Sequence, residues 1–569
     1  MISQVVYLFV LILFGGHIQL ARSQYTHPTF ANFSGPSGPL VDLGYLKVQG
    51  TTVTSLPGKY NAWLGIRYAA TPTGQQRFGA ATPIEFTVPP NVTFDATSFG
   101  PICYQGYSQS ASQNTVEPGM LFGNRQPSED CLLLDIYAPA HPASKQPLPV
   151  LLNIHGGGYD LGSSTSTSIT SLYELGHGAS GHFLLVSIQY RLAAFGFLGG
   201  DEVAALGQPN AGLADQRLAM QWVQRHISSF GGDPSKITIQ GASAGGGSVA
   251  YQYIWQGGEV SPPFRAGISD FTWWQTLPNT TQLAQQYQGV LNAANCSTLN
   301  CLRSLSSEEF YNVQQVVLNE TWRYPSGIFY FGPYVDGHYI QNLPSLEVQA
   351  GHFSKRPLII SHDTNEGLIF TPTIDTQDQF ENRVAAVFPA AGPNFRNRIN
   401  ELYPPSTTGL YGYNASVGQQ LRSDYFFGDV MVACPTYYLA SSLSDAGVSV
   451  YKYVYALPTF STAVHGRLLE LFVPTPDNDS SPSATLGRQF FKHYIPNFIM
   501  TSDPNDNSWL DGSPTNNAAL GNVAEWPAYG AESQILFVNS TATPVLITTD
   551  LDATDRCDFL WAHSVQQQV

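Results

Sequence analysis

Four short apolar runs, rich in β-branched residues, recur along the chain and predict buried strands. They are LPVLLNI at 148–154, FLLVSIQY at 183–190, ITIQ at 237–240 and PLIIS at 357–361. Continuous apolar runs are typical of strands that are covered on both faces of a parallel sheet. A fifth run, VSVYKYVYAL at 448–457, alternates more between apolar and polar residues. We therefore expect it nearer the edge of the sheet, as an edge strand.

A longer segment between the second and third runs, GLADQRLAMQWVQRHISSF, carries its apolar residues at helical spacing. Its apolar face is formed by Leu213, Leu218, Trp222, Val223 and Ile227, and it predicts a helix packed on the sheet. Strands that alternate with helices favour an α/β fold, with a mostly parallel central sheet covered by helices on both faces. The 569 residues suffice for a large core and for one or two domains.

The chain opens with MISQVVYLFVLILFGGHIQLARSQ, in which the residues from Val5 to Phe14 are apolar. This run is too short to span a bilayer but suits the core of a signal peptide. Small residues at Ala21 and Ser23 place cleavage after Ser23, so we expect a signal peptide at 1–23 and a secreted, extracellular protein. A retained membrane anchor is the alternative, and the lack of Lys and Arg before the run departs from the usual pattern.

Cysteines and glycosylation sequons agree with secretion. The six cysteines are Cys103, Cys131, Cys296, Cys301, Cys434 and Cys557, an even number that suits three disulfides but leaves their pairing open. Asn-x-Ser/Thr sequons occur at Asn32, Asn91, Asn279, Asn295, Asn319, Asn414, Asn478 and Asn539, and we expect several to carry glycans on surface loops. No spacing of cysteine and histidine is typical of a zinc site, so we expect no bound metal. The serine chemistry inferred below needs no other cofactor.

The formal net charge of −16, with only 12% charged residues, argues against a nucleic-acid partner, because an acidic surface repels phosphate. No other long apolar run suggests stable insertion into a membrane. The oligomeric state is left open.

One serine lies among small residues directly after a predicted strand, in ITIQGASAGGGSV at 237–249. The pattern around Ser243 is that of a nucleophile elbow, G-x-S-x-G, although glycine and serine also mark ordinary turns. An acyl-transfer serine needs a base, an orienting acid and hydrogen-bond donors for the oxyanion. NIHGGGYD at 153–160 resembles the glycine-rich oxyanion loop of such enzymes. SHDTNEGLIF at 361–370 offers Glu366, with Asp363 as its competitor, and STAVHGRL at 461–468 offers His465.

The chain is identified as a member of the type-B carboxylesterase/lipase family, on motifs that run almost end to end. FGGDPSKITIQGASAGG at 230–246 is similar to the serine signature of that family, and EDCLLLDIYAP at 129–139 to its second signature. LGIRYAATPTGQQRF at 64–78 and NAGLADQRLAMQWVQRHISSFGGDP at 210–234 resemble further blocks. In character the chain is most like the secreted fungal carboxylesterases and lipases. The resemblance implies a single α/β-hydrolase domain over residues 24–569.

The resemblance also implies residue roles. Ser243 would be the nucleophile, His465 the base and Glu366 the acid, with the backbone N–H groups of Gly157, Gly158 and Ala244 as the oxyanion hole. The implied disulfides are Cys103–Cys131, Cys296–Cys301 and Cys434–Cys557. Trp273 and Trp274 fall where acyl-pocket residues lie in the family, with ordinary core aromatics as the alternative. The segment AGISDFTWW departs from the family in having Asp270 and Phe271 near a Ser-Gly pair that often supports the triad.

The expected function is a secreted serine esterase that hydrolyses a small-molecule ester through an acyl-enzyme. Cholinesterases of the family carry a Trp ten residues before the second cysteine, where this chain has Leu121, and many members carry Glu where this chain has Ala242. Without these groups a choline ester gains little over a neutral one. A lipase, a sterol esterase and a hydroxycinnamoyl esterase are alternatives with the same mechanism, and a non-catalytic adhesion protein is an alternative of another class.

Overall fold

The structure is a computed structural model that describes residues 37–53, 60–84, 92–107, 125–142, 145–166, 182–206, 209–320, 329–405, 418–456, 463–467, 490–509, 523–539 and 545–563. The expected signal peptide, Leu121 and the sequons at Asn32, Asn91, Asn414 and Asn478 lie outside these ranges. Three of the remaining sequon asparagines can be placed: Asn295 and Asn319 are exposed and Asn279 is half-buried at the start of a helix.

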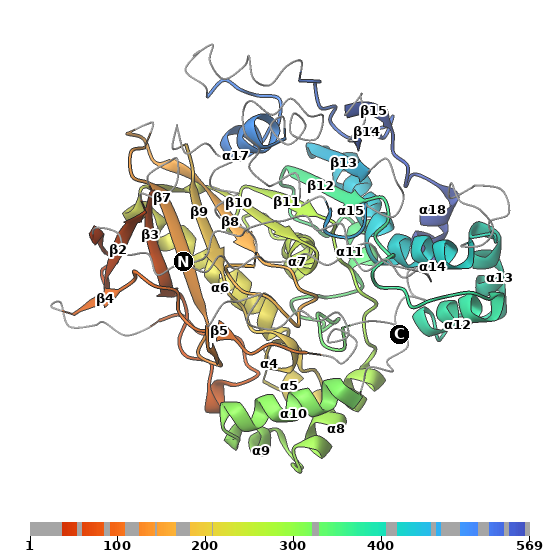
Figure 1. Cartoon of the computed structure of the whole chain (residues 1–569), viewed down its shortest axis with the longest axis horizontal. Helices are drawn as coiled ribbons and strands as arrows, with labels where there is room; N and C mark the ends of the chain where they lie inside the picture. The colour runs from red at the N-terminus through yellow and green to blue at the C-terminus, as the bar shows by residue number, and fades with distance from the viewer. Residues whose placement is uncertain are drawn as a thin grey trace, which may run out of the picture.

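A single large sheet runs through the molecule (Figure 1). Its strands are β1 (Ser37–Asp42), β2 (Lys47–Val53), β3 (Tyr60–Arg67), β4 (Thr93–Asp95), β7 (Leu133–Pro139), β8 (Leu148–Ile154), β9 (Leu184–Ile188), β10 (Gly232–Ala242), β11 (Ala266–Asp270), β12 (Leu358–Asp363), β13 (Val450–Ala456), β14 (Gln534–Asn539) and β15 (Val545–Thr549). Two short strands, β5 (Ile102–Cys103) and β6 (Pro127–Ser128), form a separate pair.

The order of the strands is β1-β2-β3-β7-β9-β8-β10-β11-β12-β13-β14-β15, with β4 paired to β2. From β9 to β14 every neighbouring pair is parallel, and antiparallel pairs flank this part on both sides. The four apolar runs thus lie in the parallel part of the sheet, as predicted. The run 448–457 forms β13, which lies nearer an edge of the sheet than the other four runs, as expected. It is not an edge strand, however: β13 pairs with β12 and β14, and all of its residues are buried. Its alternation arises because polar groups such as the Lys452 ammonium are buried there with hydrogen-bond partners.

Helices cover the sheet. They are α4 (Ala193–Phe197), α5 (Asp201–Ala204), α6 (Ala211–His226), α7 (Ala244–Ile254), α8 (Thr280–Ala293), α9 (Leu299–Ser304), α10 (Ser307–Glu320), α11 (Pro344–Gln349), α12 (Gln377–Val387), α13 (Pro393–Leu402), α14 (Gly418–Gly428), α15 (Cys434–Asp445), α17 (Ile495–Thr501) and α18 (Asp555–Ala562), with the π-helical turns η6 (Asp429–Ala433) and η8 (Phe490–Tyr494). The helices α6, α7 and α15 contact the sheet on one side, and α17 approaches β8 from the other (Figure 1). The architecture is that of the α/β-hydrolase fold, as expected.

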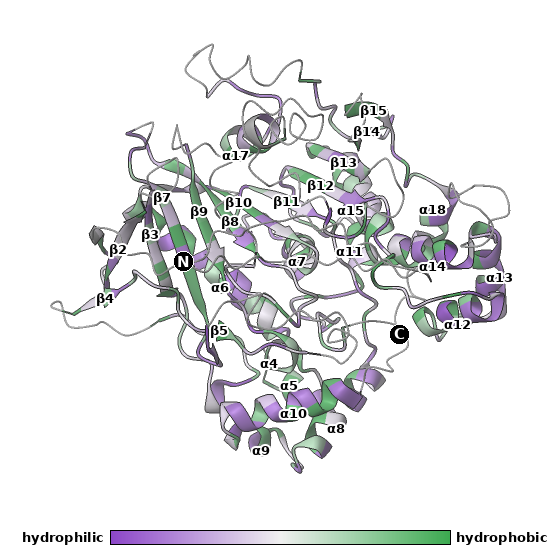
Figure 2. Ribbon diagram, in the orientation of Figure 1, coloured by the Kyte–Doolittle hydropathy of each residue, from purple (hydrophilic) through white to green (hydrophobic). Residues whose placement is uncertain are grey.

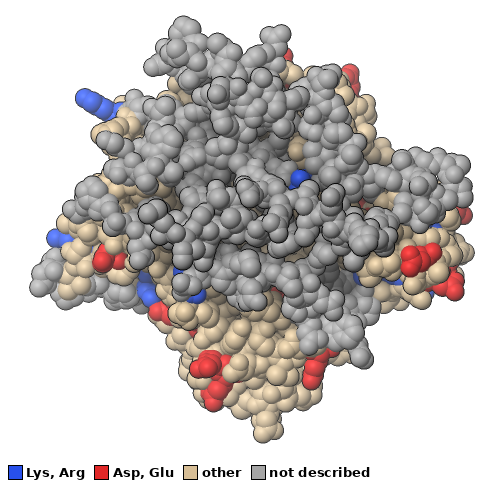
Figure 3. All heavy atoms as spheres, in the orientation of Figure 1, with Lys and Arg blue, Asp and Glu red and all other residues tan. Residues whose placement is uncertain are grey.

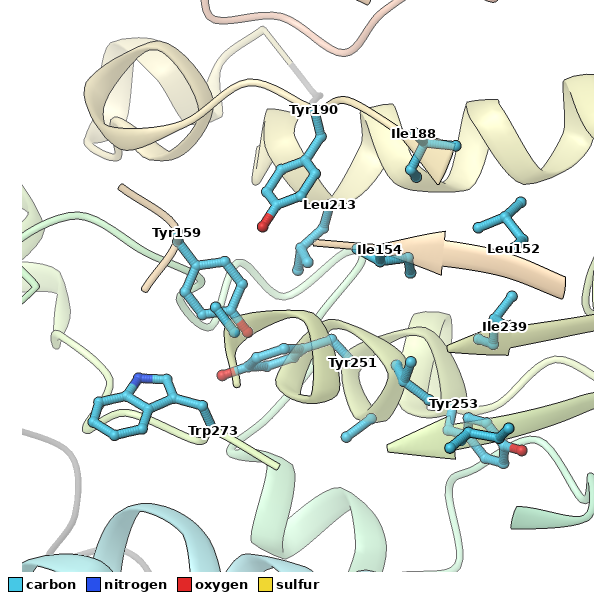
Figure 4. Close-up of a cluster of buried hydrophobic side chains, with 14 of the residues drawn as sticks. Leu152, Ile154, Tyr159, Ile188, Tyr190, Leu213, Ile239, Tyr251, Tyr253 and Trp273 are labelled. Atoms are coloured by element: carbon cyan, nitrogen blue, oxygen red, sulfur yellow. The ribbon is translucent and has the colours of Figure 1, made fainter. Parts of the chain in front are cut away.

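The core lies where the parallel strands meet these helices. Figure 2 shows the central strands as mostly hydrophobic and the outer faces of α10 and α13 as mostly hydrophilic. Leu152 and Ile154 of β8, Ile188 of β9 and Ile239 of β10 belong to one buried cluster with Tyr251 of α7 (Figure 4), and all five are fully buried. On the face shown in Figure 3 the described surface carries only scattered charged side chains.

The predicted helix forms as α6, and its apolar face is buried. Leu213, Trp222 and Val223 are at most 2% exposed, so the helical spacing in the sequence marks the side that meets the sheet.

Three disulfides link the chain. Cys103 pairs with Cys131, Cys296 with Cys301 and Cys434 with Cys557, which are the pairs implied by the family resemblance.

Candidate active site

Ser243 lies on a sharp turn between β10 and α7. Its backbone has φ 61° and ψ −126°, a region that residues other than glycine rarely adopt. A Cβ on Gly241 would lie 2.2 Å from the carbonyl oxygen of Gly245, so the turn closes only with small residues on both sides of the serine. Steric crowding therefore explains the glycines around Ser243, and the turn has the geometry of a nucleophile elbow.

Glu366 and His465 come from neighbouring loops at the same edge of the sheet. Glu366 follows β12 and His465 lies in the segment after β13, and these two strands run parallel. The loops also touch directly, because the N–H of Asn365 donates to the carbonyl of Ala463 at 2.9 Å and Asn365 forms a parallel bridge with Val464. The carboxyl ends of parallel strands thus bring together residues that are distant in sequence.

The three side chains form one hydrogen-bonded chain. The Oγ of Ser243 lies 2.7 Å from Nε2 of His465, and Nδ1 of the same ring is hydrogen-bonded to Oε2 of Glu366. With the proton on Nδ1, the imidazole donates to the carboxylate and accepts from the serine hydroxyl. Glu366 is 3% exposed, so its carboxylate is held away from solvent.

Asp363, the competing carboxylate, has another partner. Its Oδ2 accepts a hydrogen bond from the backbone N–H of Gly466 at 3.0 Å. Its own N–H donates to Oε1 of Glu366 at 2.6 Å, so it contributes to holding the glutamate. The geometry therefore places Glu366, and not Asp363, on the imidazole.

The glycine-rich loop after β8 lies against the elbow. A Cβ on Gly156 would lie 2.4 Å from the carbonyl oxygen of Ala242, and one on Gly158 would clash with the ring of Phe329 at 2.1 Å. Gly157 and Gly158 both have positive φ, of 107° and 65°. Within the described ranges, no residue accepts a hydrogen bond from the N–H groups of Gly157, Gly158 or Ala244, which remain available to a substrate oxygen.

His155, the first residue of this loop, is buried and neutral. Its ring stacks on Tyr190 with centroids 4.3 Å apart, and its Nδ1 lies 2.9 Å from the carbonyl of Gly156, to which a neutral ring donates. Burial lowers its pKa to about 4. The imidazole therefore keeps the loop in shape without placing a charge beside it.

Aromatic rings surround His465. The ring centroids of Phe271, Trp273 and Phe370 lie 4.8, 5.6 and 4.9 Å from that of the imidazole. Phe329 contacts Trp273 at 5.8 Å, so the rings extend from the base to the oxyanion loop. Figure 4 shows Trp273 near the start of α7.

Sequence reasoning singled out Trp273 but missed Phe329 and Phe370 as neighbours of the site, since a phenylalanine carries no local signal of its role. Among the described residues no ring contact joins Trp274 to this set, and its backbone N–H donates to the carbonyl of Met431 at 2.8 Å.

No group of three or more metal-ligating side chains gathers among the described residues. In the same part of the chain, no helix is both long and apolar enough to cross a membrane. The fold and the elbow together define the class of the protein: it is an α/β-hydrolase.

Comparisons with known proteins narrow this class. Residues 37–559 match the Carboxylesterase family, and the chain belongs to that family. Carboxylesterase patB of Penicillium expansum is 29% identical over 92% of this chain and 95% of its own length. Secreted triacylglycerol lipase LIP1 of Gibberella zeae is also 29% identical, over 93% of this chain and 92% of its own. The crystal structure of Aspergillus niger EstA superposes with a TM-score of 0.75 at 27% identity, covering 93% of this chain and 99% of that one.

The protein is accordingly a carboxylic ester hydrolase. Its relatives include both carboxylesterases and lipases, so membership in the family leaves the ester open. The alternative of a non-catalytic adhesion protein is set aside.

Proposed function

We propose that Ser243, His465 and Glu366 are the catalytic triad and that the reaction proceeds through an acyl-enzyme. The observation that carries the proposal is the hydrogen-bonded chain from the Ser243 Oγ through the imidazole to the buried Glu366. His465 removes the hydroxyl proton as Oγ attacks the ester carbonyl, and Glu366 stabilises the imidazolium that forms. The alcohol leaves with that proton, and water then repeats the steps on the acyl-enzyme.

The oxyanion of each tetrahedral intermediate binds the N–H groups of Gly157, Gly158 and Ala244. Support comes from the lack of any acceptor for these N–H groups among the described residues. It also comes from the position of Ala244 at the N-terminus of α7, where the helix dipole favours negative charge. The glycine loop and the elbow already pack against each other, since a Cβ on Gly156 would lie 2.4 Å from the carbonyl oxygen of Ala242.

For the substrate we propose neutral esters with short-to-medium or aromatic acyl groups. The rings of Trp273, Phe329 and Phe370 lie between the base and the oxyanion loop, where they offer an apolar surface to an acyl chain. Ala242 beside the nucleophile provides no charge to attract a cation. A comparison of kcat/KM for p-nitrophenyl butyrate, butyrylcholine and emulsified triolein tests this, and either of the last two as the best substrate contradicts it.

We also propose that the protein is secreted, with a signal peptide at 1–23 and a single domain from residue 24 onward. The three disulfides suit an oxidising compartment, and one relative carries the word secreted in its name. One sheet takes strands from Ser37 to Thr549, which favours a single domain.

The direct test of the mechanism is Ser243→Ala. We expect turnover of p-nitrophenyl butyrate to fall by several orders of magnitude while the thermal unfolding midpoint stays near that of the wild type. A serine-directed phosphonate should label the wild type at Ser243 and leave the variant unlabelled. Wild-type turnover in the variant, or labelling at another serine, contradicts the proposal.

A further inference from the structure

A row of polar side chains crosses the sheet directly below the active site. Asp270 of β11 is in register with Ser361 of β12, which is in register with Tyr453 of β13. Side chains in register lie on the same face of a sheet, so the three point the same way. None of them is more than 1% exposed.

The carboxyl of Asp270 holds this row together through one oxygen. Its Oδ1 accepts from the hydroxyl of Ser361 at 2.8 Å and from that of Tyr453 at 2.9 Å. Its Oδ2 makes no hydrogen bond of good geometry and faces the side-chain amide of Gln240 on β10. The row therefore joins the strand of the serine to the strands that precede the acid and the base.

This carboxyl has no place in the proposed reaction, yet burying it is costly. The pKa of Asp270 is raised to about 6 by burial, so the folded protein resists its ionisation. The contacts of the segment that follows Asp270 explain why the protein keeps a carboxyl at this buried position.

The 270–273 segment contacts both the nucleophile and the base. The carbonyl of Asp270 accepts from the N–H of Ser243 at 3.0 Å, and the N–H of Trp273 donates to the carbonyl of Ser243 at 3.4 Å. The rings of Phe271 and Trp273 pack edge-on against the imidazole of His465. Phe271 has φ 37°, an uncommon conformation for a bulky residue, so the segment is shaped to make these contacts.

We propose that Asp270 is a positioning residue for the reaction. Its side chain anchors the start of the 270–273 segment to β12 and β13, and the segment in turn fixes Ser243 and His465 relative to each other. The proposal rests on the proposed roles of Ser243 and His465. The geometry that Asp270 would maintain is the 2.7 Å contact between the side chains of Ser243 and His465. A displacement of about 1 Å in a reacting group can cost on the order of 100-fold in rate.

The anchor requires an oxygen that accepts two hydrogen bonds, and it does not require a charge. Asp270→Asn retains such an oxygen, and its amide can donate to the Oε1 of Gln240 once that side chain turns its amide over, since no described residue pairs with this Oε1. Asp270→Ala removes the acceptor that the buried hydroxyls of Ser361 and Tyr453 share. Asp270→Asn should therefore retain the activity that Asp270→Ala loses.

The experiment measures kcat and KM for p-nitrophenyl butyrate in Asp270→Ala, Asp270→Asn and Tyr453→Phe. We expect kcat to fall about 10- to 100-fold in Asp270→Ala with KM within about twofold, and to stay within about threefold in Asp270→Asn. Tyr453→Phe removes one donor and leaves Asp270 in place, so it tests the row if Asp270→Ala does not fold; kcat should fall about threefold or more. The rate of labelling by the phosphonate should follow kcat in each variant.

Glu129→Gln is the matched control. It disturbs a buried ion pair in which Nε of Arg77 lies 2.7 Å from Oε1 of Glu129. Both residues lie in segments that carry none of the proposed catalytic residues. This control should lower the unfolding midpoint without changing kcat. Wild-type kcat in both Asp270→Ala and Tyr453→Phe overturns the proposal, as does equal loss in Asp270→Asn and Asp270→Ala. If Ser243→Ala remains active, the proposed function itself has failed, and the two failures are thereby distinguished.

Discussion

Glu366 and Asp363 are three residues apart and both buried, yet only one of them touches the imidazole. Glu366 bonds to Nδ1 of His465, while Asp363 is turned to the backbone N–H of Gly466. The sequence offered both carboxylates and could not separate them by spacing alone. The two carboxylates differ because the turn after β12 directs Glu366 back toward the loop that carries His465.

This difference predicts unequal effects of neutralising the two carboxylates. Glu366→Gln should lower kcat on the order of 10⁴-fold, because the imidazole loses control of its tautomer and the partner of its charged form. Asp363→Asn keeps an oxygen for the N–H of Gly466 and should cost far less. Measured values of kcat on p-nitrophenyl butyrate decide between them, and a larger loss in Asp363→Asn would reverse the assignment.

The buried carboxyl of Asp270 predicts an unusual dependence of stability on pH. Burial raises its pKa to about 6 from an ordinary value of 3.8, so the unfolded chain releases this proton first as pH rises. The group therefore stabilises the fold at low pH, and that contribution is lost between about pH 4 and pH 6, by about 3 kcal/mol. Asp270→Asn does not ionise, so its free energy of unfolding should rise relative to the wild type across this window and level off above it.

Urea unfolding of both proteins at pH 4, 5, 6 and 7 measures this difference. The same substitution at Asp445, an exposed carboxylate at the end of α15, is the control. A difference between Asp270→Asn and the wild type that stays constant with pH would contradict the prediction.

Among the elements, α7 depends most closely on its glycines. A Cβ on Gly245 would lie 2.2 Å from the carbonyl oxygen of Ile154, which is backbone and cannot turn aside. Gly245→Ala should therefore displace the start of α7 and with it Ser243 and the N–H of Ala244. We expect a loss of kcat of about 100-fold or more and a destabilisation of about 1–3 kcal/mol.

Gly289→Ala in α8 is the matched control for this change. Nothing lies within 4 Å of the position its Cβ would take, so alanine should stabilise the helix by about 0.5–1 kcal/mol and leave kcat unchanged. Thermal unfolding and kcat of both variants provide the comparison. If the two variants show similar changes in kcat and in the thermal unfolding midpoint, close packing around Gly245 is not the reason why this position requires glycine.

At the scale of elements, the sequence predicted the strands of the parallel sheet and α6 well, because their apolar faces are continuous or regular. It was wrong only in making β13 an edge strand, because the buried Lys452 ammonium and Tyr453 hydroxyl of β13 are polar groups whose hydrogen-bond partners lie far away in sequence. The row formed by Asp270, Ser361 and Tyr453 could not be predicted either. It exists only because of the register between β11, β12 and β13, which no local pattern encodes.

For the molecule as a whole, the disulfides differ in the length of chain they close. Cys434–Cys557 spans 123 residues and ties α18 to the start of α15, whereas Cys296–Cys301 spans 5. In the chain-entropy account, the long loop is worth about 5 kcal/mol and the short one about 2 kcal/mol. Replacing both cysteines of the long loop by serine should lower the thermal midpoint more than the same change in the short loop. Equal decreases would mean that loop length does not govern the effect.

The proposed nucleophile and base are separated by 222 residues of sequence, although their side chains meet at 2.7 Å. A ribosome delivers Ser243 and the glycine loop early, and His465 only after β12 and β13 have been made. Domains can begin to fold during synthesis, at about 5–20 residues per second. A nascent chain with its elbow already formed would thus carry a serine without its base. If the proposed triad is correct, the growing chain has no esterase activity until β13 and the segment that carries His465 have joined the sheet.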